Sequence, residues 1–203
     1  IEIGRAVGDG SSVINGTGLV NTSGLVGLWH FNNESAFGDN DSLVRDWSVL
    51  ENPERISSLH NNGTPTNGAS YNLTNKVFGA ASMNFDGSDD YVSLGTDKYQ
   101  IQPPLTISAW FKTRTMSIPS GTTNDAIFAT RGMRLGMFID VSGKTLCLRH
   151  YGSGDSTCTN SILSTNTWYH GVVGITSGGN SFFYINGVKD SKVTTGLTTL
   201  SYV

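Results

Sequence analysis

The sequence predicts an all-β protein in which two antiparallel sheets pack face to face. Charged residues make up 14% of the 203 residues and 25 residues are glycine, a composition typical of short strands joined by tight turns. Apolar and polar residues alternate with a period of two in several short segments. Helical apolar spacing is always interrupted by Gly or Pro, so helices are expected only as short connectors.

Five segments carry the expected strands. They are residues 25–31, 43–47, 81–85, 105–112 and 181–185. Each is bounded by turn-forming residues. The side chains expected to be mostly buried in the sandwich are Trp29, Phe85, Ile107, Phe111, Trp168 and Phe183.

Turn residues place the expected hairpins. Asn186-Gly187 is the strongest signal, because both residues readily adopt the left-handed backbone of a two-residue hairpin. Further left-handed positions are expected at Asp86-Gly87, Ser142-Gly143 and Gly178-Gly179-Asn180.

The chain has two cysteines, Cys147 and Cys158, whose midpoint falls between Gly152 and Ser153 in a turn-forming run. Equal arms around a turn would place the two sulfurs opposite each other on a hairpin. The sequence therefore predicts a disulfide, and two reduced thiols are the alternative. Such bridges are typical of small β domains outside the cytosol.

Several blocks, in order, resemble laminin-G-like domains of the concanavalin A-like lectin/glucanase superfamily. The blocks are residues 25–31, 44–48, 60–64, 78–92, 105–112, 167–172 and 183–188. The resemblance implies a jelly-roll sandwich and covers about residues 25–190. The expected organisation is an N-terminal extension or strand-like arm over residues 1–23 and one sandwich domain over residues 24–203.

One departure from the family pattern concerns the end of the domain. Such domains usually finish with a strand similar to Gly-x-Ile-Asp-Glu-Val-x-Ile-Tyr, and the sequence has no such segment by Val203. A bare sheet edge leaves backbone groups unpaired. We therefore expect the edge to be covered by residues 1–23 or by a segment of another subunit, with a simply open edge as the alternative.

The catalytic motifs of hydrolases are missing from the sequence. The superfamily includes β-glucanases that use paired Glu residues on one strand, and retaining cleavage needs two neighbouring carboxyl groups. Glu occurs here only at positions 2, 34, 51 and 54. There is no Gly-x-Ser-x-Gly, phosphate-binding loop or zinc helix. We expect no enzymatic activity, and His30 and His170 are expected to have packing or surface roles.

Calcium is the expected cofactor, if there is one, because laminin-G-like relatives often hold it at the rim of the sandwich. Hard cations take several oxygen ligands. Asp86, Asp89 and Asp90 form the first candidate set. A second set consists of Asp39, Asp41 and Asp46. Ordinary turn chemistry is the alternative for both.

Glycan chemistry suggests two further kinds of site. Asn-x-Ser/Thr acceptors begin at Asn15, Asn21, Asn33, Asn40, Asn62 and Asn72, which predicts a glycosylated surface protein. Aromatic rings are platforms for sugar rings, and Trp110 is the candidate ligand-binding residue because alternation turns it away from Ile107, Ala109 and Phe111. Packing against a covering layer is the alternative for Trp110.

These observations predict a non-enzymatic extracellular adhesion module that recognises glycan or protein at a cell surface. The alternative is a structural subunit of an extracellular filament, in which strands are exchanged between copies of the chain. The net charge of -3 and the scattered 13 Lys and Arg residues exclude an obvious nucleic-acid partner. No apolar stretch approaches the length of a membrane span.

Overall fold

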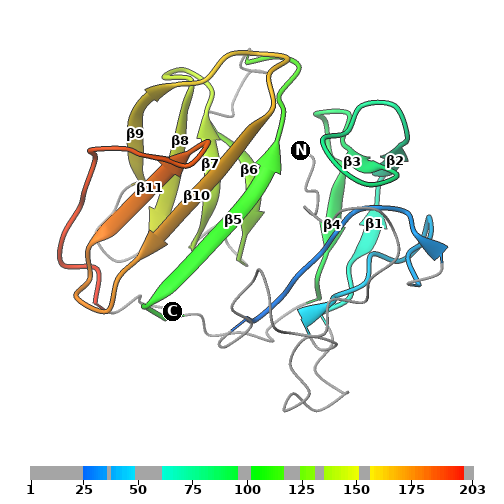
Figure 1. Ribbon diagram of the computed structural model, residues 1–203, viewed down its shortest axis with the longest axis horizontal. Coiled ribbons are helices and arrows are strands. Elements are labelled where there is room, and N and C mark those ends of the chain that lie inside the picture. The colour runs from blue at the N-terminus through cyan, green and yellow to red at the C-terminus, as the bar shows by residue number, and fades with distance from the viewer. Residues whose placement is uncertain are drawn as a thin grey trace. The chain divides into compact units, whose positions relative to one another are not determined.

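The computed structural model describes residues 25–35, 38–48, 61–95, 102–116, 124–130, 135–150 and 156–198. These residues form strands β1 to β12, which pair antiparallel, and no helical element (Figure 1). The all-β prediction is therefore confirmed. Among the described residues there is no helix long and apolar enough to cross a membrane. The chain divides into two compact units, residues 2–95 and 96–203.

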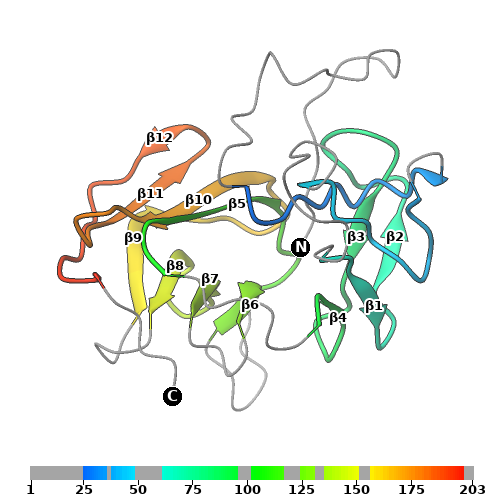
Figure 2. The ribbon, with the colours of Figure 1, turned by 90° about the horizontal axis from the view of Figure 1, so that it is seen from below.

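The unit of residues 96–203 contains two four-stranded sheets, which lie in separate layers (Figure 2). The first, here called the β5 sheet, has the order β12-β11-β10-β5. The second, here called the β8 sheet, has the order β6-β7-β8-β9. Strands of the β5 sheet are β5 (Leu105–Phe111), β10 (Tyr169–Ile175), β11 (Ser181–Ile185) and β12 (Val188–Lys189). Strands of the β8 sheet are β6 (Asn124–Ala129), β7 (Leu135–Asp140), β8 (Thr145–His150) and β9 (Ser156–Ile162).

The core of this unit lies between the inner faces of the two sheets. From the β5 sheet it receives Ala109, Phe111, Val173 and Phe183, each 3% exposed or less. From the β8 sheet it receives Leu135, Met137, Ile139, Leu146 and Leu148, which are also buried. A Cβ atom added at Gly171 would lie 2.7 Å from the Met137 methyl. The sheets therefore approach closely at Gly171 of β10, whose nearest neighbours in the other sheet are Met137 of β7 and Leu146 of β8.

The turns of this unit largely follow the expected chemistry. Asn186 and Gly187 have φ of 51° and 80° and join β11 to β12, with Ile185 opposite Val188. Gly179 also takes a positive φ, in the turn between β10 and β11. One expectation is corrected: between β7 and β8 the left-handed residue is Lys144, with φ of 54°, and not Gly143.

The disulfide between Cys147 and Cys158 joins β8 to β9, where the two residues face each other in the register. The predicted bridge is thus present in the structure. The central turn residues of that hairpin, 151–155, lie outside the described residues.

The unit of residues 2–95 has shorter strands in its described part. They are β1 (Thr64–Thr66), β2 (Ser70–Asn72), β3 (Ser82–Asn84) and β4 (Tyr91–Ser93), paired as β1-β4 and β2-β3. Its core consists of Phe31, Val44, Ala69 and Met83. Trp29 and Phe85 pack against that cluster and are partly buried.

Two of the expected strands are not regular strands. Residues 25–31 and 43–47 make isolated bridges, between Trp29 and Asp46 and between Val44 and Gly63. Side chains replace the ladder here: Leu28 N donates to Asp46 Oδ1 at 3.0 Å and Trp29 Nε1 donates to Asn61 O at 2.7 Å. A backbone satisfied by side chains needs no continuous strand partner.

Of the six side chains expected in the core, Phe111 and Phe183 are fully buried. The other four, Trp29, Phe85, Ile107 and Trp168, are half-buried, and none is exposed. The N-terminal extension over residues 1–23 lies outside the described residues, so its separation from the domain and its role at a sheet edge stay predictions.

Candidate functional site

The outer face of the β5 sheet, turned away from the core, carries a row of aromatic rings. In an antiparallel register directly opposed residues share a face. His170 lies opposite Trp110, and Val172 lies between Ser108 and Tyr184. The residues of this face, here called the aromatic face, are Thr106, Ser108, Trp110, His170, Val172, Phe182, Tyr184 and Lys189. None of them is buried, in contrast to Ala109 and Phe111 on the same strand. The predicted outward orientation of Trp110 is therefore confirmed.

Trp110, His170 and Ser108 form one end of the aromatic face. The ring centroids of Trp110 and His170 are 5.3 Å apart. His170 Nε2 lies 2.9 Å from Ser108 Oγ, and the backbone N–H of His170 donates to Asn186 Oδ1 at 2.8 Å. Burial lowers the pKa of His170 below its usual 6.5. The imidazole is consequently neutral at physiological pH and presents polar nitrogens beside an indole ring.

Phe182 and Tyr184 form the other end of the aromatic face. Their rings meet edge to face with centroids 6.2 Å apart. The Phe182 ring lies over Gly174, since a Cβ atom there would come within 2.3 Å of it. The glycine leaves room for an aromatic ring to lie flat on the sheet. Flat, partly exposed rings combine apolar area with a fixed geometry.

Two lysines border these rings. Lys112 follows Trp110 by two residues, and its Nζ lies 5.4 Å from the centroid of the Trp168 ring. Lys189 is exposed and opposite Tyr184. The strands β5, β10, β11 and β12 contain no Asp or Glu. Lys189 is the one Lys, Arg, Asp or Glu residue within these four strands.

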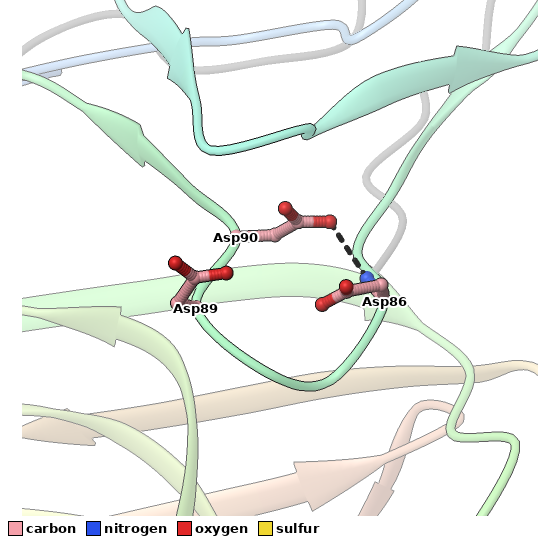
Figure 3. Close-up of side chains that lie close together, drawn as sticks. All are labelled: Asp86, Asp89 and Asp90. Carbon is pink, nitrogen blue, oxygen red and sulfur yellow. Dashed lines mark hydrogen bonds between the residues drawn. The ribbon is translucent and has the colours of Figure 1, made fainter.

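Asp86, Asp89 and Asp90 come together in the loop between β3 and β4, here called the acidic loop (Figure 3). One carboxylate oxygen from each lies within 4.8 Å of the others. Asp90 Oδ2 accepts from the backbone N–H of Asp86 at 2.7 Å, and Asp86 Oδ1 accepts from that of Ser88 at 2.7 Å. These bonds hold the loop in a turn and direct the carboxylates toward one another.

The donor set of the acidic loop fits a hard cation. Asp90 Oδ1 is buried and has no hydrogen-bond partner among the described residues. An unpaired buried carboxylate oxygen is costly unless a proton or a cation compensates it. The neighbouring turn is fixed to this loop, because Asn67 Nδ2 donates to Asp89 O at 3.0 Å. Asp86, Asp89 and Asp90 would thus supply oxygen ligands of the kind Ca²⁺ prefers.

The second acidic set is not brought together as a metal site among the described residues. The carboxylate of Asp46 is buried and accepts from the backbone N–H groups of Leu28, Ser48 and Asn61. Burial raises the pKa of Asp39, although its Oδ1 accepts from the backbone N–H of Arg45 at 2.8 Å. Both side chains organise the local backbone, and Asp41 is exposed.

The glycosylation acceptors differ in their surroundings. Asn40 is exposed, whereas Asn33, Asn62 and Asn72 are partly buried. Asn62 Oδ1 accepts from the backbone N–H of Asp46, while Asn72 Oδ1 accepts from the hydroxyl of Thr74 in an exposed turn. Asn15 and Asn21 lie outside the described residues. Glycosylation at each of these positions stays a prediction.

The remaining histidines are consistent with packing. His30 stacks on Trp47 with ring centroids 4.9 Å apart, and His150 is buried with Nε2 at 3.1 Å from Thr157 Oγ1. His60 lies outside the described residues.

Sequence reasoning missed Asp190, a buried carboxylate that connects the two sheets. It follows β12 and accepts from the backbone N–H groups of Asn160 and Ser161 on β9 and from the Ser161 hydroxyl at 2.7 Å. Its position after a predicted hairpin was visible in the sequence. The hydrogen bonds between Asp190 and β9 depend on tertiary contacts, which leave no local pattern in the sequence.

Comparison with protein families matches residues 86–202, more than half of the chain, to the laminin-G type of the concanavalin A-like lectin/glucanase superfamily. This region includes the acidic loop and all strands of both four-stranded sheets. Comparisons with curated proteins and with solved structures gave no match. The predicted resemblance is thus confirmed over residues 86–202, and with it a family composed mainly of binding domains. The chain belongs to the concanavalin A-like lectin/glucanase superfamily as a laminin-G-like domain.

Proposed function

We propose that this chain is a non-enzymatic, extracellular binding module that recognises a glycan at a cell surface through the aromatic face of the β5 sheet. The observation that carries the proposal is the outward row of Trp110, His170, Tyr184 and Phe182 on one rigid sheet. Aromatic faces stack against the apolar faces of sugar rings, while polar groups at the edge bind hydroxyls. Ser108 and His170 supply such groups.

Two further observations support the extracellular and non-enzymatic parts of the proposal. The Cys147–Cys158 disulfide is typical of oxidising compartments. The strands that carry the aromatic face, β5, β10, β11 and β12, contain no Asp or Glu. They therefore offer no carboxylate as a general acid or nucleophile for glycoside cleavage.

Glycan binding is tested by replacing Trp110 with Ala. The wild-type protein is screened on a glycan array, and the strongest ligand is titrated by calorimetry against both proteins. We expect the variant to lose at least about tenfold in affinity, the order found for stacked aromatic anchors. Tyr91→Ala is the control, because Tyr91 is half-exposed in the other unit. Equal affinity of wild type and Trp110→Ala would contradict the proposal, and binding to a protein partner alone would replace glycan by protein as the ligand.

The acidic loop is proposed to bind Ca²⁺. The support is the buried, unpaired Asp90 Oδ1 beside Asp86 and Asp89. Bound Ca²⁺ would supply positive charge that offsets carboxylate repulsion and would stabilise the folded state by mass action. We expect Ca²⁺ to raise the Tm of the wild-type protein and not that of Asp89→Asn. Asp41→Asn, at an exposed position outside the loop, should respond like wild type. An unchanged wild-type Tm in excess Ca²⁺ would contradict the site.

A filament subunit is the second candidate function. Its supporting observation is that β5 ends the order of its sheet, with no described strand on its other edge. Unpaired edges template the addition of a strand. Electron microscopy of the purified protein separates the candidates: ordered filaments favour the subunit, and monodisperse particles that bind glycan favour the module.

A further inference from the structure

We propose that Asn72, the last residue of β2, carries an N-linked glycan and is the preferred acceptor among Asn33, Asn40, Asn62 and Asn72. The inference concerns a sugar attached covalently to the chain. It rests on the extracellular part of the proposed function and is independent of the aromatic face. An Asn-x-Ser/Thr triplet is a weak signal by itself, so the folded surroundings of each acceptor decide between them.

The triplet Asn72-Leu73-Thr74 lies in an exposed turn after β2. Asn72 Oδ1 accepts from the Thr74 hydroxyl at 3.0 Å and from the backbone N–H groups of Thr74 and Asn75 at 3.0 and 2.9 Å. These bonds hold the carbonyl end of the amide against the turn. Asn72 Nδ2 makes no hydrogen bond to the described residues and is not buried. Since Leu73 and Thr74 are exposed as well, the turn has room for a sugar on Nδ2.

The attachment is a glycosyl transfer to this amide nitrogen. Nδ2 of Asn72 forms a bond to the anomeric carbon of a lipid-linked oligosaccharyl diphosphate, which is the co-reactant. The bond from that carbon to the diphosphate oxygen breaks, the diphosphate leaves with the electron pair, and one amide proton passes to a base. The triplet requires a hydroxyl on its third residue. In the folded turn, the Thr74 hydroxyl contacts the amide of Asn72 directly.

Two of the other acceptors are enclosed by the fold. Asn62 is partly buried and lies between Asn61 and Gly63, which are both buried. Asn33 is partly buried and directly follows the buried Asn32. Among the described residues, no hydrogen bond joins either amide to the hydroxyl of its own triplet. A glycan at Asn33 or Asn62 would have to pass buried neighbours, which disfavours both positions.

Asn40 is exposed, but a carboxylate lies within its triplet. Asp41 is the exposed middle residue, and Asn40 Oδ1 accepts from the backbone N–H of Ser42 and not from the Ser42 hydroxyl. The glycosyl donor carries an anionic diphosphate, and like charges repel at close range. Residues 61–85, by contrast, contain no Asp or Glu. Charge therefore favours Asn72 over Asn40.

Secretory expression tests the inference. The chain is expressed behind a signal peptide in eukaryotic cells that attach N-glycans, and peptides are mapped after enzymatic deglycosylation in heavy-oxygen water, which marks each occupied Asn. We expect Asn72 to be occupied in most molecules, Asn40 in fewer, and Asn33 and Asn62 in none. An unoccupied Asn72, or higher occupancy at any of the other three, would overturn the inference.

Variants of the triplet separate attachment from folding. Thr74→Ala should abolish occupancy of Asn72, whereas Thr74→Ser keeps the hydroxyl and should retain most of it. Leu73→Ala is the matched control, because it changes an exposed side chain beside the acceptor and leaves the triplet intact. Equal occupancy in Thr74→Ala and Thr74→Ser would contradict attachment at Asn72.

Two further variants test the charge argument and the independence from the aromatic face. Asp41→Ala should raise the occupancy of Asn40, because it removes the carboxylate beside that acceptor. An unchanged occupancy of Asn40 would contradict the charge argument. Trp110→Ala should keep Asn72 occupied as in the wild-type protein. Loss of glycan binding and loss of glycan attachment are therefore separate outcomes, and an unoccupied Asn72 leaves binding by the aromatic face standing.

Discussion

At the residue scale, buried carboxylates that accept several hydrogen bonds organise the backbone of the described residues. Asp46 accepts from three backbone N–H groups in the unit of residues 2–95, and Asp190 accepts from three backbone N–H groups and one hydroxyl in the other unit. A carboxylate that accepts several hydrogen bonds tolerates burial because the bonds replace its hydration. Removing one such side chain leaves several donors unpaired.

Asp190→Asn is expected to lower the free energy of unfolding at pH 7 by about 1–2 kcal/mol. The side-chain NH2 group of Asn cannot accept the hydrogen bonds that the second carboxylate oxygen of Asp190 accepts. Desolvation raises the pKa of Asp190, but the hydrogen bonds from Lys192, Ser161 and Asn160 prevail and hold it below 3.8. A depressed folded-state pKa stabilises the protein above the unfolded value of about 3.9 and loses that effect as pH falls through the folded value.

Urea denaturation across a pH series measures this effect. The difference between wild type and Asp190→Asn should be full at neutral pH and shrink below about pH 4. Asp140→Asn is the control, since Asp140 accepts from Ser142 in an exposed turn. A difference that stays constant down to pH 2 would show that the charge of Asp190 is not responsible.

At the element scale, agreement between sequence and structure follows the strength of the local pattern. Residues 181–185 form β11 and 105–111 form β5, where alternation and turn residues indicate the same strand. Residues 25–31 alternate less regularly, and their backbone is satisfied by Asp46 and Asn61. Such distant side-chain partners cannot be read from local periodicity.

Close approach of the two sheets predicts that Gly171→Ala destabilises the protein. An added Cβ would lie 2.7–2.9 Å from Met137, Phe111 and Leu146. Overpacking of this kind costs about 1–3 kcal/mol. Gly178→Ala is the matched control, since its Cβ would find its nearest neighbour at 3.8 Å in an exposed turn. Thermal unfolding should separate the variants, and equal Tm values would contradict the packing.

The disulfide between β8 and β9 is expected to stabilise the folded protein. Cys147→Ser with Cys158→Ser should lower the free energy of unfolding by about 2–3 kcal/mol, because the bridge closes a short loop and constrains the unfolded chain. Mass analysis under non-reducing conditions should find no free thiol in the wild-type protein. Two free thiols in the folded protein would contradict the bridge.

At the scale of the whole molecule, the expectation of one domain over residues 24–203 stays a prediction. Contacts divide the chain into residues 2–95 and 96–203, whereas the family match begins at residue 86, before that division. We predict one cooperative unfolding transition for the whole chain. Asp46→Asn in one unit and Gly171→Ala in the other should then lower the same Tm. Two calorimetric transitions, each shifted by one variant, would show independent domains.

The sequence by itself determined the all-β class, the β5 and β11 strands, the Asn186-Gly187 turn, the disulfide and the family, because composition, period and turn chemistry are local properties. Tertiary structure alone decided which side chains meet. It grouped Trp110 with His170 and Tyr184, gathered the Asp86 loop around a buried Asp90 oxygen, and placed Asp190 against β9. Strand order and register bring these residues together, and both depend on pairings between segments far apart in the chain.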